Sequence, residues 1–499
     1  MAKEPTMKEF RVLLINSNTM LDTLITAGIG VLAGCVKEAG FGIRLFDTTF
    51  YRTADITGDE ARARALQVRP TRLEDFGVAP ADVDVVEDFV RVVEEYKPDL
   101  IGLSCIEVTW ELGARLLEAV AGRGIPTVAG GPFPTFAPEM CIRHPAVDMV
   151  CVGEGEEALV ELCQRLRDGQ DHSDVLNLWV KQNGKVYKNA VRPPVDLTSL
   201  PPQDWEVYDR RRFWKPMGGR VSVTGAFEMN RGCPYSCTYC INSGYNELYS
   251  DKYYREKNID RLIDEMVEKK ERYQLAYCYL VAESFLTTPL KRIERFVQLY
   301  REKVNLPFWV EVRPESVTRE KIDLLVGIGC ESVSVGVESG NYDLRKNVLG
   351  RLISDDTILR AFDVLRETKL RISANNVIGF PGETREMIFE TIELDRKIAP
   401  DGVIVGYFSP YKGSKLREVC ELEGLIREDE IAGDYRVGPT LDMPQMSKVE
   451  LSGLHRTFPL YVKFPREEWG DIRRAEADTP EGNALFMEYT ERYRREFLK

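Results

Sequence analysis

The first third of the chain alternates short apolar runs with amphipathic stretches. Five apolar runs have the length of buried strands: residues 10–15, 42–46, 100–105, 126–129 and 147–152. Helical patterns lie between them, at residues 26–39, 85–96 and 110–121. Residues 52–82 are polar and irregular, as in an insertion. Strands buried on both faces that alternate with helices predict a doubly wound parallel sheet, whose ligands bind at the carboxyl ends of the strands.

A second array of the same kind follows a connector at residues 166–220, where two Pro-Pro pairs stiffen the chain. Its strand candidates lie at residues 222–229, 276–282, 307–312, 331–337, 372–378 and 402–408. Six βα units are short of the eight of a closed barrel, so we expect an open, partial barrel. From about residue 421 the pattern is irregular and charged.

These patterns predict an α/β protein of several domains. We expect an N-terminal doubly wound, Rossmann-like domain in residues 1–165 and a linker in residues 166–220. A partial (β/α)6 barrel follows in residues 221–420, and a small C-terminal domain in residues 421–499. A chain of 499 residues has room for two to four domains at roughly 150 residues each.

Composition narrows the classes of function. The chain has 67 Lys and Arg against 80 Asp and Glu, a net charge of −13, which argues against a mainly electrostatic nucleic-acid partner. No apolar run reaches the roughly 18–20 residues that span a bilayer, and residues 1–10 lack the apolar core of a signal peptide. We therefore expect a cytoplasmic protein with no membrane partner, whose eleven cysteines are mostly thiols.

Three cysteines are crowded directly after the first strand of the second array. Cys233, Cys237 and Cys240 have the spacing CxxxCxxC. Three thiolates on one loop can hold three irons of a [4Fe–4S] cube, and the fourth iron then stays open for substrate chemistry. The other interpretations are a zinc site with a remote fourth ligand and three core cysteines. A zinc knuckle usually has paired CxxC units, and no second pair exists in the sequence.

The surroundings of this loop resemble the radical S-adenosylmethionine (SAM) superfamily. Three stretches carry the resemblance beyond the cysteines: SVGVESG at residues 334–340, IGFPGET at residues 378–384 and YFSPYKGS at residues 407–414. The resemblance implies that SAM chelates the open iron and is cleaved to a 5′-deoxyadenosyl radical. It places SAM against Tyr239, Glu283, Arg313, Ser334, Glu338, Ile378 and Gly379.

The resemblance also implies roles for three of these residues. Tyr239 occupies the aromatic position near the adenine. Glu283 matches the acidic residue that holds the methionine ammonium, although the usual GGE or DD pattern reads Ala282-Glu283 here. Arg313 is a candidate partner for the SAM carboxylate, because a guanidinium pairs with a carboxylate in a bidentate manner.

The N-terminal domain contains a misleading glycine pattern. Gly28, Gly30 and Gly34, with Asp47 downstream, look like a dinucleotide fingerprint. That fingerprint begins directly where the first strand ends, which is about a dozen residues earlier here. We therefore do not expect NAD, and the glycines are more easily explained by close helix packing or the approach of a bulky ligand.

Residues 10–165 more closely resemble the cobalamin-binding domain that is fused to many radical SAM enzymes. The resemblance rests on Ser104 in LIGLSC, on GGPFPT at residues 130–135 and on VGEGE at residues 152–156. It implies cobalamin contacts at Asn16, Ser17, Ser104, Cys105, Glu107, Val108, Gly130, Gly131, Pro132, Phe133, Gly153, Glu154 and Gly155.

One departure from that family concerns the cobalt ligand. The DxHxxG motif of methionine-synthase-type domains follows the first strand, where this chain reads NSNTM without a histidine. His144 lies in a different loop. We therefore expect base-off cobalamin with no histidine ligand, and the loop from Ile106 to Trp110 is the candidate cover for the lower face of the corrin.

Together, the two resemblances imply a cobalamin-dependent radical SAM C-methyltransferase that acts on an unactivated sp3 carbon. SAM is then both radical source and methyl donor, and a reducing electron donor is an implied partner. The layout also resembles the archaeal glutamine C-methyltransferases that modify methyl-coenzyme M reductase, which implies a glutamine of a protein or peptide as substrate.

Other functions remain open. They are a small-molecule, lipid or phosphinate methylase, a non-methylating cyclase or ring-contraction enzyme, and a non-catalytic cobalamin- or SAM-responsive protein, against which the complete set of cysteines argues. Residues 421–499 are expected to cap the barrel, with a solvated helical tail as the alternative. Tyr411, Arg456 and Tyr461 are the candidate substrate residues.

Overall fold

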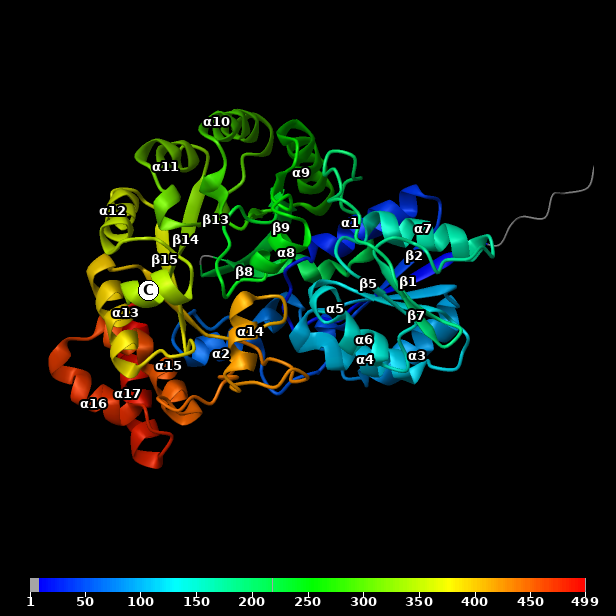
Figure 1. Cartoon of the computed structure of the whole chain (residues 1–499). Helices are drawn as coiled ribbons and strands as arrows, with labels where there is room; N and C mark the ends of the chain where they lie inside the picture. Colours follow the sequence, from blue (N-terminus) through cyan, green and yellow to red (C-terminus); the bar gives the residue numbers. More distant parts are fainter. Residues whose placement is uncertain (1–8, 218, 499) are drawn as a thin grey trace, which may run out of the picture. The chain divides into compact units, whose positions relative to one another are not determined.

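The computed structural model of the chain describes residues 9–217 and 219–498. The chain divides into two compact units (Figure 1). The first unit contains Gly77–Arg212 and the described residues up to Asp55. The second contains Ile56–Phe76 and the described residues from Phe213 onward. Each unit is built on its own seven-stranded sheet.

The sheet of the first unit has the strand order β2-β1-β3-β4-β5-β6-β7. Its strands are β1 (Arg11–Asn16), β2 (Gly42–Asp47), β3 (Leu100–Ser104), β4 (Thr127–Gly130), β5 (Met149–Cys151), β6 (Leu178–Gln182) and β7 (Lys185–Lys188). The first five strands are parallel, as predicted, and the order reverses between β1 and β3. The antiparallel strands β6 and β7 were not predicted; they lie in the predicted linker and extend this sheet.

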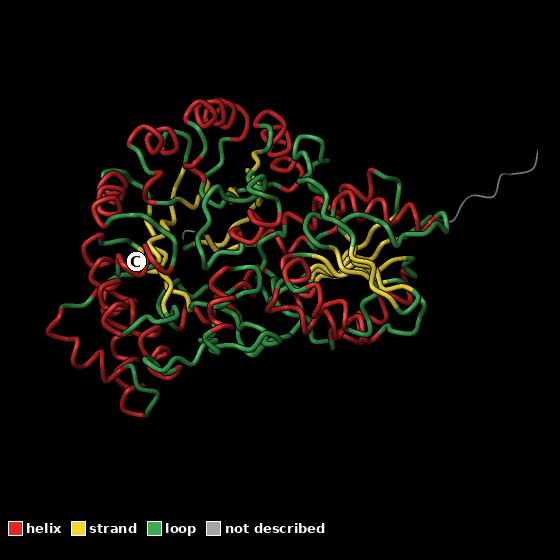
Figure 2. Tube along the Cα trace, in the orientation of Figure 1, coloured by secondary structure: helices red, strands yellow, loops and turns green. Residues whose placement is uncertain are grey.

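Helices cover both faces of this sheet (Figure 2). They are α1 (Ala27–Glu38), α3 (Val85–Tyr96), α4 (Trp110–Ala119), α5 (Pro132–Phe136), α6 (Pro138–Arg143) and α7 (Glu156–Arg167). Helix α1 packs against α7, and α3 packs against α4. In α3 the Asp84 side chain accepts from the first backbone N–H groups, and apolar residues at helical spacing form its buried stripe. Because both faces are covered, β1 is almost entirely buried.

The sheet of the second unit has the order β16-β15-β14-β13-β12-β9-β8. Its strands are β8 (Trp214–Met217), β9 (Arg220–Glu228), β12 (Tyr277–Val281), β13 (Phe308–Val312), β14 (Cys330–Glu338), β15 (Arg371–Ile378) and β16 (Gly402–Tyr407). The six predicted strands run parallel from β9 to β16, which confirms the open partial barrel. Strand β8 adds an antiparallel edge. A two-stranded ribbon pairs β10 (Asn230–Arg231) with β11 (Arg255–Glu256).

Helices lie on the outer side of this curved sheet (Figure 1). They are α9 (Ile259–Tyr273), α10 (Leu290–Leu299), α11 (Arg319–Val326), α12 (Asp355–Arg366) and α13 (Arg385–Ile398). The short α8 (Asn242–Leu248) follows the three-cysteine loop, and the Leu416 N–H at the start of α14 (Lys415–Leu422) donates to the carbonyl of Thr238 in that loop at 2.9 Å. In β15 every second residue is fully buried and the residues between are partly exposed. Side chains of β15 therefore alternate between a buried face and a partly exposed face.

Residues 56–76, hereafter the edge segment, are ordered rather than irregular. They contain α2 (Gly58–Arg64), which Thr57 and Glu60 start with a capping box. Leu66 is fully buried in the core of the second unit. The side-chain amide of Gln67 donates to the carbonyl of Val405 at 2.8 Å and accepts from its N–H at 3.2 Å. Gln67 thus satisfies part of the free edge of β16.

Residues 423–447 consist of loops and turns, as the irregular pattern indicated, whereas residues 448–496 are mostly helical. The helical part contains α15 (Lys448–Lys463), α16 (Trp469–Ala475) and α17 (Pro480–Glu496). Helix α15 packs on β16 and α13 and buries ten of its residues, so the solvated-tail interpretation was wrong for this helix. Charged residues on the exposed faces of these helices obscured the apolar stripe in the sequence.

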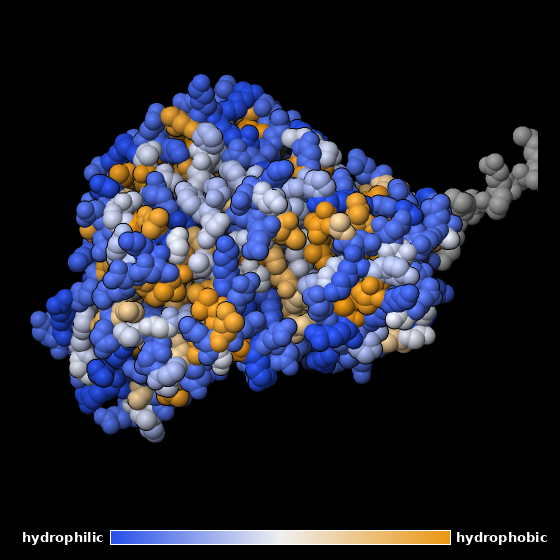
Figure 3. All heavy atoms as spheres, viewed as in Figure 1, coloured by the Kyte–Doolittle hydropathy of each residue, from blue (hydrophilic) through white to orange (hydrophobic). Residues whose placement is uncertain are grey.

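No helix in the described part of the chain is long and apolar enough to cross a membrane. Figure 3 shows a face dominated by hydrophilic residues, with apolar residues in separate groups. All eleven cysteines lie in described segments and are free thiols.

Candidate functional site

At the carboxyl edge of the first sheet, the loop after β4 lies directly against the loop after β3. Gly131 has φ +105°, and a Cβ there would lie 2.6 Å from the carbonyl oxygen of Cys105. The Cys105 N–H donates to the carbonyl of Gly130 at 3.2 Å. Only glycine fits this position, because both its backbone angle and the space beside it exclude a side chain.

Thr135 joins the loops after β4 and β5. Its hydroxyl donates to the carbonyl of Gly131 at 2.8 Å and accepts from the N–H of Gly153 at 3.1 Å. Gly153 also has a positive φ, +85°. Thr135 was not among the predicted cobalamin residues, although it is the last residue of the GGPFPT stretch that indicated this site.

Asn16 and Ser17 hold the edge together from β1. The Ser17 hydroxyl donates to the carbonyl of Thr109 at 2.8 Å, and Asn16 Nδ2 donates to Asp47 Oδ1 at 3.1 Å. Asp47 in turn pairs with the buried Arg212 at 3.0 Å. Both predicted side chains are buried in these contacts, so their contact with cobalamin stays a prediction.

The other predicted cobalamin residues separate into two sets. The buried ones are Cys105, Glu107 and Phe133. The partly exposed ones are Ser104, Val108, Gly130, Gly131, Pro132, Gly153, Glu154 and Gly155. Of these, Glu154 already accepts a hydrogen bond from the N–H of Val195 at 2.7 Å. In the loop after β3, Ile106 is 46% exposed, whereas Trp110 is buried against Phe133.

His144 makes its own contacts within the first unit, and the absence of a histidine ligand to cobalt stays a prediction. His144 follows α6, its Nε2 lies 3.1 Å from Glu118 Oε1, and its ring packs edge-on against Trp110. The edge residues fit a cobalamin: glycines without side chains allow close approach of a large ligand, and backbone groups of three loops lie together. They fit a cobalamin that takes no imidazole from this edge.

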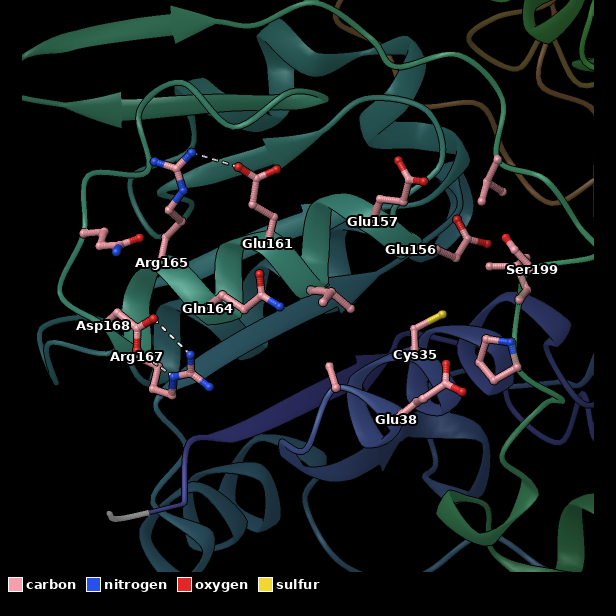
Figure 4. A pocket seen from close by; sticks show the side chains of 16 residues that line it. Cys35, Glu38, Glu156, Glu157, Glu161, Gln164, Arg165, Arg167, Asp168 and Ser199 are labelled. Carbon is pink, nitrogen blue, oxygen red and sulfur yellow. Dashed lines mark hydrogen bonds and ion pairs between the residues drawn. The ribbon is translucent and has the colours of Figure 1, made fainter.

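A groove of about 680 Å³ in the first unit does not belong to this edge (Figure 4). It lies along α1 and α7 and is bounded by residues 195–201. None of the predicted cobalamin residues lines it. Its charges pair with one another, as in Arg165–Glu161 at 2.9 Å and Arg167–Asp168 at 2.7 Å.

In the second unit, two side chains from outside the three-cysteine loop hold its N-terminal end. Gly232 has φ +82°, and a Cβ there would lie 2.6 Å from the ring of Tyr253. Asn246 Nδ2 donates to the carbonyls of Cys233 at 3.1 Å and Tyr235 at 3.3 Å. Asn246 was not predicted, because nothing in the sequence distinguishes it from any other residue of a short helix.

The three thiols suit a cluster better than a single ion. Cys233 and Cys237 are buried and Cys240 is partly exposed. Among the described residues, no three His, Cys, Asp or Glu side chains converge on one metal ion. In a cube each cysteine binds its own iron, so the sulfurs need not converge. Burial raises the pKa of Cys233 to about 11 and that of Cys240 to about 12, so metal binding must displace their protons.

Arg351 joins two of the predicted SAM residues. It is 3% exposed, and its Nη1 donates to the hydroxyl of Tyr239 and to Glu338 Oε1, each at 3.0 Å. Its Nη2 donates to the carbonyl of Gly336 at 2.7 Å. Glu338 has φ +70°, at an irregularity of the β14–β15 pairing. Arg351 was not predicted, because its contact with Tyr239 spans 112 positions and its position after β14 carries no sequence signal.

Arg313, predicted to pair with the SAM carboxylate, touches the three-cysteine loop. Its Nη1 donates to Cys237 Sγ at 3.2 Å, and its Nε donates to Glu315 Oε1 at 2.7 Å. Its pairing with SAM stays a prediction.

Of the remaining predicted SAM residues, Ser334 lies in the middle of β14, and Glu283, Ile378 and Gly379 lie at or just after strand ends of the barrel. Ser334 accepts from Trp309 Nε1 at 3.2 Å, and Glu283 is an electrostatic neighbour of Cys233 and Cys240. Ile378 is fully buried, and the Gly379 N–H donates to Glu383 Oε2 at 2.6 Å.

Glu311 is a further carboxyl group on β13 that sequence reasoning missed. Burial, with Glu283 and Glu338 nearby, raises its pKa to about 7. The polar residue within the otherwise apolar strand FWVEV was the available signal.

The side chains of the three candidate substrate residues donate hydrogen bonds to other groups of the second unit. The Tyr411 hydroxyl donates to the carbonyl of Gly433 at 3.1 Å, and Arg456 Nη1 donates to Asn483 Oδ1 at 2.9 Å. Tyr461 is 1% exposed and donates to Glu476. Their role in substrate binding stays a prediction.

Two family models match the two units. Residues 227–394 match the radical SAM superfamily, and residues 15–163 match the B12 binding domain.

Several curated proteins are similar over most of the chain. An uncharacterized methyltransferase of Pyrococcus horikoshii is 25% identical over 384 residues, 76% of this chain and 81% of that protein. The anaerobic magnesium-protoporphyrin IX monomethyl ester cyclase of Rubrivivax gelatinosus is 23% identical over 447 residues, 88% and 73% of the two chains. The cytidylyl-2-hydroxyethylphosphonate methyltransferase of Streptomyces wedmorensis is 20% identical over 479 residues, 86% and 85% of the two chains.

Solved structures share the fold. The cobalamin-dependent SAM radical enzyme OxsB, with aqua-cobalamin and SAM bound, matches with a TM-score of 0.67 at 16% identity, over 98% of this chain and 72% of that one. The radical SAM methyltransferase TsrM of Kitasatospora setae, with cobalamin and a [4Fe–4S] cluster bound, matches with a TM-score of 0.63 at 18% identity, over 83% and 75%.

Proposed function

We propose that this chain, a radical SAM enzyme with a B12-binding domain and with a [4Fe–4S] cluster, SAM and cobalamin as cofactors, methylates an unactivated sp3 carbon. One observation carries the proposal: a single chain contains both a three-cysteine loop suited to a cluster and a glycine-lined sheet edge suited to a corrinoid. Similarity to methyltransferases over three quarters or more of the chain supports it.

When bound, the cluster and SAM supply a radical that removes hydrogen from carbon, and cobalamin supplies the methyl group. The chain's own residues bind and orient these groups. Cys233, Cys237 and Cys240 ligate the cluster, and Arg351 holds Tyr239 and Glu338 in place for SAM. An unactivated C–H bond is not acidic, so the reaction asks for positioning and exclusion of water more than for a general base.

We expect cobalamin to bind base-off in the first unit. His144 is engaged with Glu118 and Trp110, and the loop after β1 contains no histidine. The exposed Ile106 in the loop after β3 is the side chain best suited to cover the lower face of the corrin without ligating cobalt.

The first substrate to test is a peptide that contains glutamine, with small molecules, lipids and phosphinates as the alternative substrates. A non-methylating cyclase is the second candidate function. It is favoured by the similarity to the Rubrivivax cyclase, which extends over 88% of this chain.

The test is anaerobic incubation of the cluster- and cobalamin-loaded enzyme with SAM that carries a CD3 methyl group. Mass spectrometry should find CD3 in the product, with S-adenosylhomocysteine and 5′-deoxyadenosine formed in equal amounts. The Cys240→Ala variant, which lacks one cluster ligand, should form no 5′-deoxyadenosine. Formation of 5′-deoxyadenosine with an altered but unlabelled substrate would favour the cyclase instead.

A further inference from the structure

One guanidinium group lies against one thiol of the three-cysteine loop. Arg313 Nη1 is 3.2 Å from Cys237 Sγ, within hydrogen-bond distance for a sulfur acceptor. Arg313 is 8% exposed and Cys237 is 6% exposed, so little water competes for this contact. The contact joins the end of β13 to a loop 76 positions earlier in the chain.

Two further contacts hold the guanidinium in this orientation. Arg313 Nε donates to Glu315 Oε1 at 2.7 Å. The guanidinium also lies over the ring of Tyr235, 3.9 Å from its centroid, and Tyr235 belongs to the three-cysteine loop itself. A planar group that is bonded at Nε and stacked on a ring has little freedom to turn its N–H away from the sulfur.

The thiols of Cys237 and Cys240 have unequal surroundings. Cys240 Sγ receives a longer contact from a neutral donor, Asn242 Nδ2 at 3.7 Å. Cys237 receives a cationic donor and has a second cation, Arg351, as an electrostatic neighbour. Positive charge and N–H donors at cluster sulfurs stabilise the reduced state, because reduction adds negative charge that the sulfurs share.

We propose that Arg313 sets the reduction potential of the cluster by donating a hydrogen bond to Cys237 Sγ. The proposal rests on the cluster of the proposed function. The step is the transfer of one electron from an external low-potential one-electron donor to the oxidised cluster. Arg313 gains and loses no proton in this step, because a guanidinium stays charged in proteins. Arg313 is a positioning residue in this role and need not touch SAM.

The experiment is a redox titration, monitored by electron paramagnetic resonance, of the reconstituted full-length enzyme without SAM. The variants are R313Q and R313K, and the control is R319Q, which removes an exposed arginine on α11. At the midpoint potential of the wild type, R313Q should lower the ratio of reduced to oxidised cluster about tenfold, or ~59 mV for one electron. R313K keeps the positive charge but lacks the planar guanidinium, so its midpoint potential should shift less than that of R313Q. The midpoint potential of R319Q should match that of the wild type.

The proposal is overturned if R313Q and R313K bind iron normally and keep the wild-type midpoint. Weaker SAM binding with an unchanged midpoint would assign Arg313 to the SAM carboxylate alone. Failure of both variants to hold iron would also count against the proposal, because a donor that only sets the potential is not needed for ligation. The redox titration does not depend on methyl transfer. A shifted midpoint potential would therefore support the role of Arg313 even if the enzyme does not methylate its substrate.

Discussion

At the scale of single residues, Gly131 shows how a backbone position can decide ligand binding. Its φ of +105° and ψ of −174° belong to a region that only glycine visits readily, and its α-carbon faces the carbonyl of Cys105. The neighbouring Gly122 has a similar φ of +81°, but nothing lies within 4 Å of where a Cβ would be. An alanine at Gly122 would therefore meet only backbone strain, whereas an alanine at Gly131 would also meet a steric clash.

Gly131→Ala should reduce the free energy of unfolding by about 2–3 kcal/mol and weaken cobalamin binding at least tenfold, because the loops after β3 and β4 must move apart. Urea unfolding of the apoprotein and absorbance titration with cobalamin measure the two effects. Gly122→Ala should reduce stability by only about 1–2 kcal/mol and leave cobalamin affinity unchanged. Equal cobalamin affinity in both variants would mean that this edge does not hold the cofactor.

Ile106 provides a test of the lower face of the corrin. In the wild type, the electron paramagnetic resonance spectrum of bound cob(II)alamin should show no hyperfine splitting from a protein nitrogen. Ile106→His places an imidazole in the same loop and should introduce that splitting, because neutral imidazole is a good ligand for cobalt. Ile106→Leu is the matched control. Nitrogen coordination already present in the wild type would exclude the base-off assignment.

His455 predicts how stability depends on pH. Burial lowers its pKa from the ordinary 6.5 to about 4, and its ring stacks on Tyr407 at 4.0 Å. Between these values the unfolded chain binds a proton that the folded chain does not, so stability is lost as the pH falls from about 6.5 to 4. The loss should amount to about 3 kcal/mol.

The His455 contribution is the difference between the wild type and His455→Gln, measured by urea unfolding at pH 7.5 and at pH 5. About 2 kcal/mol of the loss should be present at pH 5. The difference is needed because buried carboxyls with a raised pKa, such as Glu311, change stability in the opposite direction over this range. His172→Gln, in a turn of the first unit, is the control and should retain the wild-type slope. If the two variants show the same slope, the buried histidine is not the group responsible.

At the scale of elements, the strands were predictable and their partners were not. Apolar runs located every parallel strand of both sheets within a few residues, because strands covered by helices read as continuous apolar sequence. Strands β6 and β7 escaped prediction because they are short, antiparallel and partly exposed. Helices α15–α17 were not predicted as packed elements, because many charged residues lie between the buried apolar residues in the sequence.

The edge segment is the element whose role depends most on tertiary structure. An unpaired strand edge such as that of β16 invites misassociation, and natural sheets cover it. Gln67 makes both backbone hydrogen bonds of Val405 from 338 positions away, and His455 lies 3.2 Å from the same amide. The sequence of this segment is polar, which concealed its two buried leucines, Leu66 and Leu73, of which Leu66 lies in the core of the second unit.

Gln67→Leu should reduce the free energy of unfolding by about 1–3 kcal/mol, because it leaves the buried N–H of Val405 without its acceptor, while the carbonyl keeps His455 Nε2 at 3.0 Å. Denaturant unfolding measures the effect. Gln298→Leu, on the exposed face of α10, is the matched control and should change stability by less than about 0.5 kcal/mol. Similar values for the two variants would show that the edge segment contributes little.

At the scale of the whole molecule, the second unit is not one continuous stretch of sequence, because it includes residues 56–76 as well as the residues from Phe213 onward. Residues 213–499 alone would lack the edge segment and so lose the buried Leu66 and the contact of Gln67 with β16. This fragment should unfold at lower denaturant concentration than the same fragment preceded by residues 56–76 through a flexible linker. Equal midpoints for the two fragments would contradict this prediction.

The sequence by itself determined the chemistry that the chain can perform: the spacing of Cys233, Cys237 and Cys240, the glycine-rich strand ends and the alternation of strands and helices. These features are local, since a loop fixes the spacing of its own ligands and a strand fixes its own apolar run. Only the tertiary structure decided long-range contacts such as those of Arg313 with Cys237, Arg351 with Tyr239 and Gln67 with Val405. The residues of these pairs lie 76, 112 and 338 positions apart, so only the packing of strands and helices brings donor and acceptor together.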